Sequence, residues 1–236
     1  MRGIINYFNQ MNWIGLLGLL ISAAAALVCI TFHELSHGYV AYRLGDPTAK
    51  RMGRLSMNPL KHLDPFGFLM MIFVGVGWAK PVPVDMRYFK HPKQGMAVTA
   101  LAGPVSNFLM ALASMLLASL LLHFGPMHLL PAAFVVYFLC NVAILSVGLG
   151  LFNLIPISPL DGSKVLFALL PDRWYYTILR YEKYVMIAVI ALTFFGAFDG
   201  PLSACINGVM TMLCKATGFG VHNFNFYVSL PHILYY

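Results

Sequence analysis

The chain begins with a long stretch that carries no charged side chain and ends directly in a cluster of ionisable ones. From Met11 to Phe32 there is no Lys, Arg, Asp or Glu, and the next residues are His33-Glu34-Leu35-Ser36-His37. An apolar run of about 20 residues is long enough to cross a bilayer as a helix. Ionisable groups at membrane depth are costly, so those that occur there are usually functional. The pattern therefore predicts a membrane-spanning helix with a chemically active end.

The spacing of His33 and His37 predicts a metal site at that end. Residues i and i+4 lie on one helix face, so the two imidazoles can bind a single Zn²⁺ ion. The glutamate that follows the first histidine of such a motif acts as a general base, which is the role expected for Glu34. Cys29 lies one turn before His33 and is an alternative ligand, although a buried structural thiol is the more ordinary interpretation.

Composition identifies the class of protein. The 236 residues are 60% hydrophobic and 10% charged, whereas soluble domains carry roughly 25% charge. The net charge of +7 comes from basic residues in short loops between apolar runs, which is typical of membrane topology and not of nucleic-acid binding. The four cysteines lie in apolar segments without a CxxC pair, so no disulfide framework is expected.

Apolar runs predict the membrane segments. Spans are expected at 12–44, 96–124 and 132–155, and shorter apolar stretches lie at 184–198 and 202–213. The run at 66–78 is too short to cross and is expected to be re-entrant. We therefore expect an all-α polytopic membrane protein with five to six transmembrane or re-entrant segments. A single integral membrane domain is expected over 1–236, with a catalytic core at about 12–170 and C-terminal spans and tail at 184–236.

The distribution of charge orients these spans. Basic residues concentrate in 43–93 and 164–183, while the connector 125–131 has no Lys, Arg, Asp or Glu. The positive-inside rule then places the two basic stretches on the cytoplasmic side. The His33–His37 end of the first span and the end of the third span share that side, so we expect the active site there.

Catalytic zinc takes three protein ligands and leaves one position open, and Asp161 is the candidate for the third. It follows the apolar, proline-broken end of the third span, where a metal would compensate its charge. An ordinary turn or helix-cap carboxylate before Gly162 is the alternative. The remaining carboxylates considered lie among basic loop residues and are expected to be solvated: Asp46, Asp85, Asp172 and Glu182.

Two asparagines lie within otherwise apolar spans near the same face. Asn107 and Asn153 are candidates for binding the substrate or stabilising the oxyanion that forms on a peptide carbonyl. Hydrogen bonding between helices is the alternative role for each.

Three motifs occur in order, each at a helix end: His33 to Gly38, Ala102 to Asn107, and Asn153 to Gly162. Over roughly residues 20 to 170 the chain resembles the site-2 protease family of intramembrane zinc metalloproteases. The resemblance implies one Zn²⁺ per chain on His33, His37 and Asp161, with Glu34 as the catalytic base. It also implies transmembrane protein substrates.

The resemblance further implies a small membrane-associated β element, formed by 54–58 and 78–84, which presents the substrate backbone by strand addition. Neither a PDZ-like nor a CBS-like domain is evident, so a minimal, core-only member is expected. The plasma or inner membrane of a prokaryote is the expected location.

The rival interpretation is a metal-binding membrane protein without hydrolase activity, either a transporter or a degenerate homologue. A transporter would carry further ionisable residues at mid-membrane depth, and the second, fourth and fifth apolar segments have none. A degenerate homologue would have lost one of Glu34, His37 and Asp161. Because all three are present, the sequence favours the enzyme.

Overall fold

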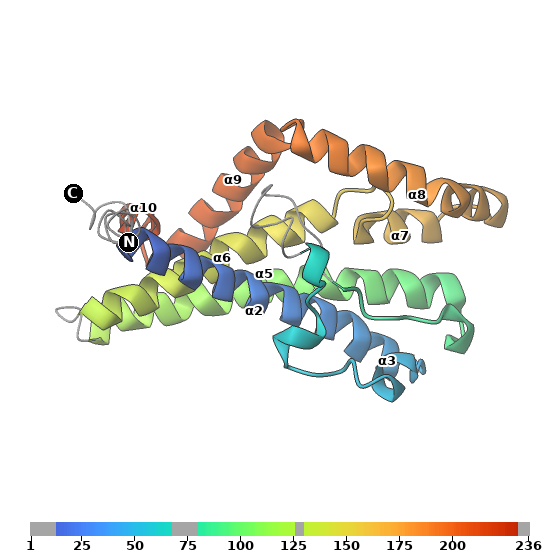
Figure 1. Ribbon diagram of the computed structural model, residues 1–236, viewed down its shortest axis with the longest axis horizontal. Helices are drawn as coiled ribbons and strands as arrows, with labels where there is room; N and C mark the ends of the chain where they lie inside the picture. Colours follow the sequence, from blue (N-terminus) through green and yellow to red (C-terminus); the bar gives the residue numbers. More distant parts are fainter. Residues whose placement is uncertain (1–12, 68–79, 126–129, 231–236) are drawn as a thin grey trace, which may run out of the picture.

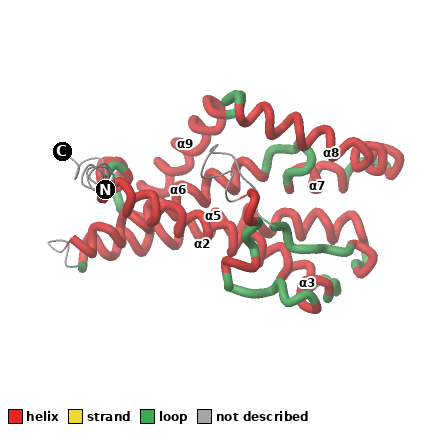
Figure 2. The backbone as a smooth tube through the Cα atoms, in the orientation of Figure 1, coloured by secondary structure: helices red, strands yellow, loops and turns green. Residues whose placement is uncertain are grey.

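The computed structural model describes residues 13–67, 80–125 and 130–230. Over this part of the chain the regular elements are helices joined by loops, and no strand is present (Figure 2). The all-α prediction is therefore confirmed. The helices, with η denoting a 3-10 turn, are α2 (Trp13–Arg43), α3 (Thr48–Arg51), η1 (Pro59–Lys61), η2 (Met86–Tyr88), α5 (Pro92–Phe124), α6 (Leu130–Asn153), α7 (Asp161–Ala168), α8 (Asp172–Phe194), α9 (Asp199–Thr217) and α10 (Val221–Val228).

The centre of the molecule is formed by α2, α5 and α6, which pack against one another (Figure 1). Each is long and apolar enough to cross a membrane, with a mean hydropathy of 2.4, 2.0 and 2.2 respectively. Their bounds agree with the spans expected at 12–44, 96–124 and 132–155. The main difference is at the start of α5, which begins at Pro92, before the apolar run. Proline suits the first helical turn because its missing N–H would have no partner there.

The two shorter apolar stretches form a bent pair. The chain bends by 78° between Lys183–Phe194 of α8 and α9, and the pair has the length and composition of one broken span or a re-entrant loop. Gly196, in the left-handed region with φ of 72°, lies at the break. The described part of the chain thus has three helices able to span a membrane, or four if the bent pair counts as one. Most of the segment expected to be re-entrant, 66–78, lies outside the described residues.

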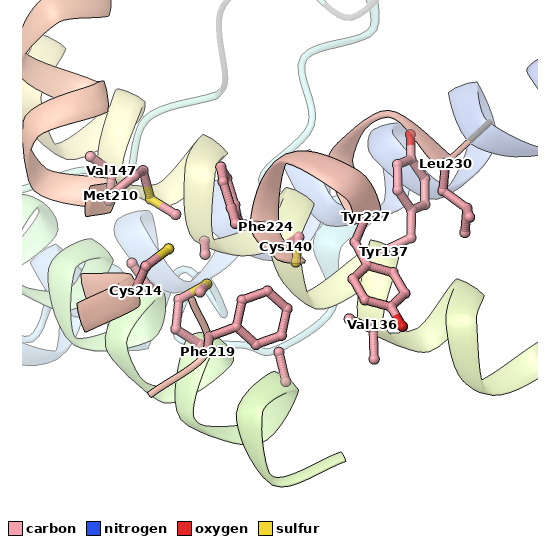
Figure 3. Packing of buried hydrophobic residues seen from close by; sticks show 14 residues of the cluster. Val136, Tyr137, Cys140, Val147, Met210, Cys214, Phe219, Phe224, Tyr227 and Leu230 are labelled. Atoms are coloured by element: carbon pink, nitrogen blue, oxygen red, sulfur yellow. The ribbon is translucent and has the colours of Figure 1, made fainter. Parts of the chain in front are cut away.

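A hydrophobic core lies where α9 and α10 cover α5 and α6. Met210 and Cys214 of α9 meet Phe219 of the following turn and residues of α6 such as Cys140 (Figure 3). The C-terminal tail contributes to this core, because Phe224 and Tyr227 of α10 are also buried there (Figure 3). The four cysteines are free, as expected, and only Cys205 is exposed.

The expected β element is not confirmed. No strand forms over 54–58 or over 80–84, and residues 78–79 lie outside the described part. We call the segment 80–84 the strap. The two segments nevertheless meet, because the buried Arg54 donates from Nη2 to the carbonyls of Lys80 (2.6 Å) and Pro81 (3.2 Å). Pro81 and Pro83 lack the N–H groups that a ladder would use. The strap is therefore held by the Arg54 side chain and not by strand pairing.

The end of the strap is fixed by a carboxylate that we expected to be solvated. Asp46 is fully buried, and its Oδ2 accepts a hydrogen bond from the Asp85 N–H at 2.7 Å. Its Oδ1 accepts from the N–H of Thr48 at 2.9 Å, at the start of α3. The prediction for Asp46 was wrong because Thr48 nearby and Asp85, directly after the strap, together satisfy the buried carboxylate.

Candidate metal centre

Three potential metal ligands converge where α2 meets the start of α7. His33 and His37 are 5% and 8% exposed, and Asp161 is 6% exposed. Asp161 Oδ2 lies 3.1 Å from His33 Nε2 and 3.0 Å from His37 Nε2, and the two Nε2 atoms are 3.0 Å apart. Zinc bonds of about 2.0–2.1 Å in tetrahedral geometry place ligand atoms roughly 3.3 Å apart. The arrangement therefore matches one face of a zinc tetrahedron to within a few tenths of an ångström.

Helix α5 forms the wall behind the two imidazoles, and it approaches closely because residue 103 is glycine. A Cβ atom there would lie 2.4 Å from His37 Nε2 and 2.6 Å from His33 Cε1. Any side chain would occupy the space in which the ligand atoms meet. Gly103 thus keeps open the space between His33, His37 and Asp161, which a methyl group would fill. We call this space the cradle.

The same helix provides partners for the outer ring nitrogens. His37 Nδ1 donates a hydrogen bond to the carbonyl oxygen of Thr99 at 2.7 Å, so its Nε2 carries the lone pair that faces the cradle. Asn107 Nδ2 lies 3.1 Å from His33 Nδ1. Such outer contacts fix the ring orientation of metal-binding histidines.

Asp161 divides its two oxygens between two tasks. Oδ2 faces the imidazoles, while Oδ1 accepts a hydrogen bond from Lys164 Nζ at 3.1 Å. Burial raises the pKa of Asp161, while the charge of the hydrogen-bonded Lys164 lowers it. Because Lys164 binds Oδ1, Oδ2 is the oxygen available to a metal.

Gly162 allows Asp161 to reach this position. A Cβ atom at residue 162 would lie 2.3 Å from the carbonyl oxygen of Leu154, just beyond the end of α6. The first turn of α7 packs against that carbonyl only because no side chain intervenes.

Glu34 is adjacent to His33 but outside the ligand group. Its Oε2 accepts a hydrogen bond from the Val82 N–H of the strap at 2.8 Å. Val82 lies between Pro81 and Pro83, so it carries the only backbone N–H in that tripeptide. The strap thus holds one oxygen of Glu34 and leaves Oε1 for another partner.

Comparison with known proteins shows the family of this chain. The sequence profile described as Peptidase family M50 matches residues 124–196. A Bacillus subtilis protein named "Putative zinc metalloprotease YwhC" is 42% identical over 173 residues, which are 70% of this chain and 76% of that protein. The chain belongs to peptidase family M50, the site-2 protease family. It is therefore a protease with membrane-spanning helices.

More distant relatives have similar names. "Putative zinc metalloprotease Rip2" of Mycobacterium tuberculosis is 32% identical over 148 residues, and "Zinc metalloprotease MJ0392" of Methanocaldococcus jannaschii is 26% identical over 150 residues. These alignments cover 61% and 63% of this chain, but only 54% and 34% of the relatives. No solved structure matches the chain.

Within this M50 protease, the remaining candidate residues lie apart from the ligand group. Cys29 is buried against α6, with Sγ 3.5 Å from the Val142 carbonyl oxygen and 3.2 Å from Ser146 Oγ. Among the described residues, the group of three that can hold a metal contains Asp161 and not Cys29. Asn153 Nδ2 donates to the Leu149 carbonyl oxygen of its own helix at 2.9 Å.

Sequence reasoning missed several residues that shape the site. Gly103 lies four positions before Asn107, a spacing that places both on one helix face and was a usable signal. Lys164, three positions after Asp161, was another. The flanking prolines single out the Val82 N–H. The Thr99 carbonyl carried no sequence signal, because every residue has such a group.

Proposed function

We propose that this protease is a zinc endopeptidase that cleaves transmembrane segments of membrane proteins near the cytoplasmic face. One Zn²⁺ ion per chain is held by His33, His37 and Asp161. The observation that carries the proposal is the convergence of these three ligand atoms, within 4.8 Å of one another, in the cradle left open by Gly103.

The donor set suits zinc. Two imidazole nitrogens and one carboxylate oxygen form a common ligand set of catalytic zinc, which keeps a fourth position open. When bound, zinc supplies Lewis acidity towards water and the scissile carbonyl. The Thr99 carbonyl holds the His37 ring as such a site requires, and Asn107 contacts the outer nitrogen of the His33 ring.

Glu34 moves the proton in this proposal. Its Oε2 is held by the Val82 N–H, so Oε1 takes the proton of the attacking water and later returns it to the leaving amine. Asn153, half-buried at the end of α6, is the candidate donor to the oxyanion once its amide turns away from the Leu149 carbonyl. Asn107 is the second candidate for that role.

The substrate is proposed from the membrane setting. A helical transmembrane segment hides its carbonyls in hydrogen bonds along its own helix, so it must unwind locally before attack. Four backbone polar groups at the start of the strap are engaged: Lys80 N–H, Lys80 O, Pro81 O and Val82 N–H. A substrate strand that pairs there has to displace Glu34, Arg54 or the His62 carbonyl.

Orientation follows from charge. The loops that flank the ligand group are basic, with Lys50, Arg51, Lys61 and Lys80 exposed, and the positive-inside rule puts such loops in the cytoplasm. The protein is accordingly proposed to lie in the cell membrane with its active site towards the cytoplasm.

The test uses the full chain in proteoliposomes with a panel of single-span proteins tagged at both ends. The proposal expects cleavage of at least one member at a bond within its span, abolished by a zinc chelator and by Glu34→Gln. Equal cleavage by Glu34→Gln would contradict the assigned base. Bound zinc with no cleavage of any member would favour a metal-binding protein without hydrolase activity.

A further inference from the structure

We propose that Asn107 is a positioning residue of the metal centre, whose side-chain oxygen accepts a hydrogen bond from Nδ1–H of His33 in the metal-loaded protein. The inference rests on the proposed zinc site and goes beyond it. It assigns to Asn107 the task of presenting His33 Nε2 to the metal, in place of contact with the substrate.

The environment of Asn107 points to this task. Its side chain is fully buried, and Nδ2 lies 3.1 Å from His33 Nδ1, an atom of a ring that is itself 5% exposed. The other amide atom, Oδ1, is buried and has no hydrogen-bond partner among the described residues. A buried polar atom without a partner is rare and requires an explanation.

Metal binding changes the hydrogen-bond partner that His33 Nδ1 requires, from a donor to an acceptor. An imidazole that binds a metal through Nε2 carries its hydrogen on Nδ1, and that hydrogen needs an acceptor. Asn107 now directs its donor, Nδ2, at this atom. Rotation of the amide by half a turn exchanges two groups of almost equal size and brings Oδ1 to the same position. The acceptor that His33 needs is therefore the atom that now lacks a partner.

After the rotation, Nδ2 faces the place that Oδ1 now occupies, where Oδ1 accepts no hydrogen bond from the described residues. The two orientations of the amide therefore differ in the atom that they present to His33 Nδ1, a donor in one and an acceptor in the other. The presence of the metal decides which orientation of the amide is favoured.

At His37, a backbone group supplies the acceptor that the outer ring nitrogen requires. Its Nδ1 donates to the backbone carbonyl of Thr99, which can only accept. Both outer partners thus come from α5, one from the main chain and one from a side chain. Only the partner of His33 is open to substitution.

Two residues of α5 act together at the imidazoles. Gly103 and Asn107 are four residues apart and so share a helix face. Gly103 admits the imidazoles by having no side chain, and Asn107 contacts one of them a turn later. The glycine and the asparagine together form the wall that shapes and orients the ligand pair.

The test measures zinc affinity of the full chain in detergent, by competition with a chelator of known affinity. Asn107→Leu removes the acceptor and keeps the volume, and a loss of about 10- to 100-fold in zinc affinity is expected. Asn107→Asp keeps an acceptor of the same shape and should bind zinc within a few-fold of wild type. Asn153→Leu is the matched control and should leave zinc affinity unchanged, because its amide donates to the Leu149 carbonyl of its own helix.

Two results would overturn the inference. The first is an Asn107→Leu variant that binds zinc as tightly as wild type. If that variant also lost cleavage, the loss would indicate the oxyanion role for Asn107. The other is nitrogen NMR of the zinc-loaded wild-type protein in which His33 binds through Nδ1, a measurement that does not depend on any variant folding. Absence of zinc from the folded wild-type protein would instead overturn the proposed function.

Discussion

Glu34 and Val82 are joined by a hydrogen bond of 2.8 Å from the backbone N–H of Val82 to Oε2 of Glu34. The donor is the single backbone N–H of a Pro-Val-Pro segment, and the acceptor is the only carboxylate within the His33–His37 motif. The contact links the strap to the α2 residue proposed as catalytic base. It fixes one carboxylate oxygen and so orients the other.

Glu34→Gln should keep the site and lose the chemistry. The amide oxygen of Gln can still accept from Val82 N–H, so zinc content and strap position should be unchanged. Without a base, cleavage should fall by about 10²- to 10⁴-fold. Single-turnover cleavage of a test substrate, with zinc analysis of the same sample, measures both. Cleavage within a few-fold of wild type would remove Glu34 from the mechanism.

Gly103→Ala should abolish metal binding. The new Cβ would lie 2.4 Å from His37 Nε2, so either a ligand or α5 has to move. Zinc per chain should drop well below that of wild type. Gly208→Ala in α9 is the matched control, because a Cβ there meets nothing within 4 Å, and the exchange should leave zinc content intact. Full zinc content in Gly103→Ala would mean that the cradle lies elsewhere.

Cys29→Ala should retain zinc. The thiol is buried between Val142 and Ser146, so its loss should lower the free energy of unfolding by about 1 kcal/mol without touching the ligands. Zinc analysis and thermal unfolding of the variant check the two parts. Zinc loss from a folded Cys29→Ala protein would restore the alternative in which Cys29 is a ligand.

Arg54→Met should loosen the strap. It removes the donor that holds the carbonyls of Lys80 and Pro81 while keeping much of the side-chain volume. Hydrogen exchange at the Val82 amide should accelerate, and cleavage should fall because Glu34 loses a fixed partner. Arg87→Met is the control, since Arg87 forms an exposed ion pair with Asp85, and such pairs contribute little. Equal exchange in both variants would show that Arg54 does not hold the strap.

Local patterns in the sequence predicted the spans and the close approach of His33 and His37 well. The uncharged run before His33 and the apolar stretches before Phe124 and Asn153 determine long helices almost by composition alone, because a bilayer requires about 20 apolar residues in each. The approach of Asp161 to the two histidines was predicted from a shared membrane face. Its distance from them depends on Gly162 packing against Leu154, which no local pattern contains.

Tertiary contacts explain the errors. Asp46 was expected in water, yet it is buried and accepts a hydrogen bond from the N–H of Asp85, 39 residues further along the chain. The β element was expected from 54–58 and 78–84, yet Arg54 and the strap prolines produce a side-chain attachment. Both outcomes depend on a partner far along the chain, which the pattern of one segment does not encode.

The most direct test of the proposed site is zinc per chain in the purified, folded protein, measured for wild type, Glu34→Gln and Asp161→Ala. Asp199→Ala, at the exposed start of α9, serves as a control for loss of a carboxylate. We predict one zinc in wild type, in Glu34→Gln and in Asp199→Ala, and little in Asp161→Ala, whose carboxylate lies 3.0–3.1 Å from both imidazoles. Folded wild-type protein without zinc, or Asp161→Ala with a full complement, would contradict the proposed site.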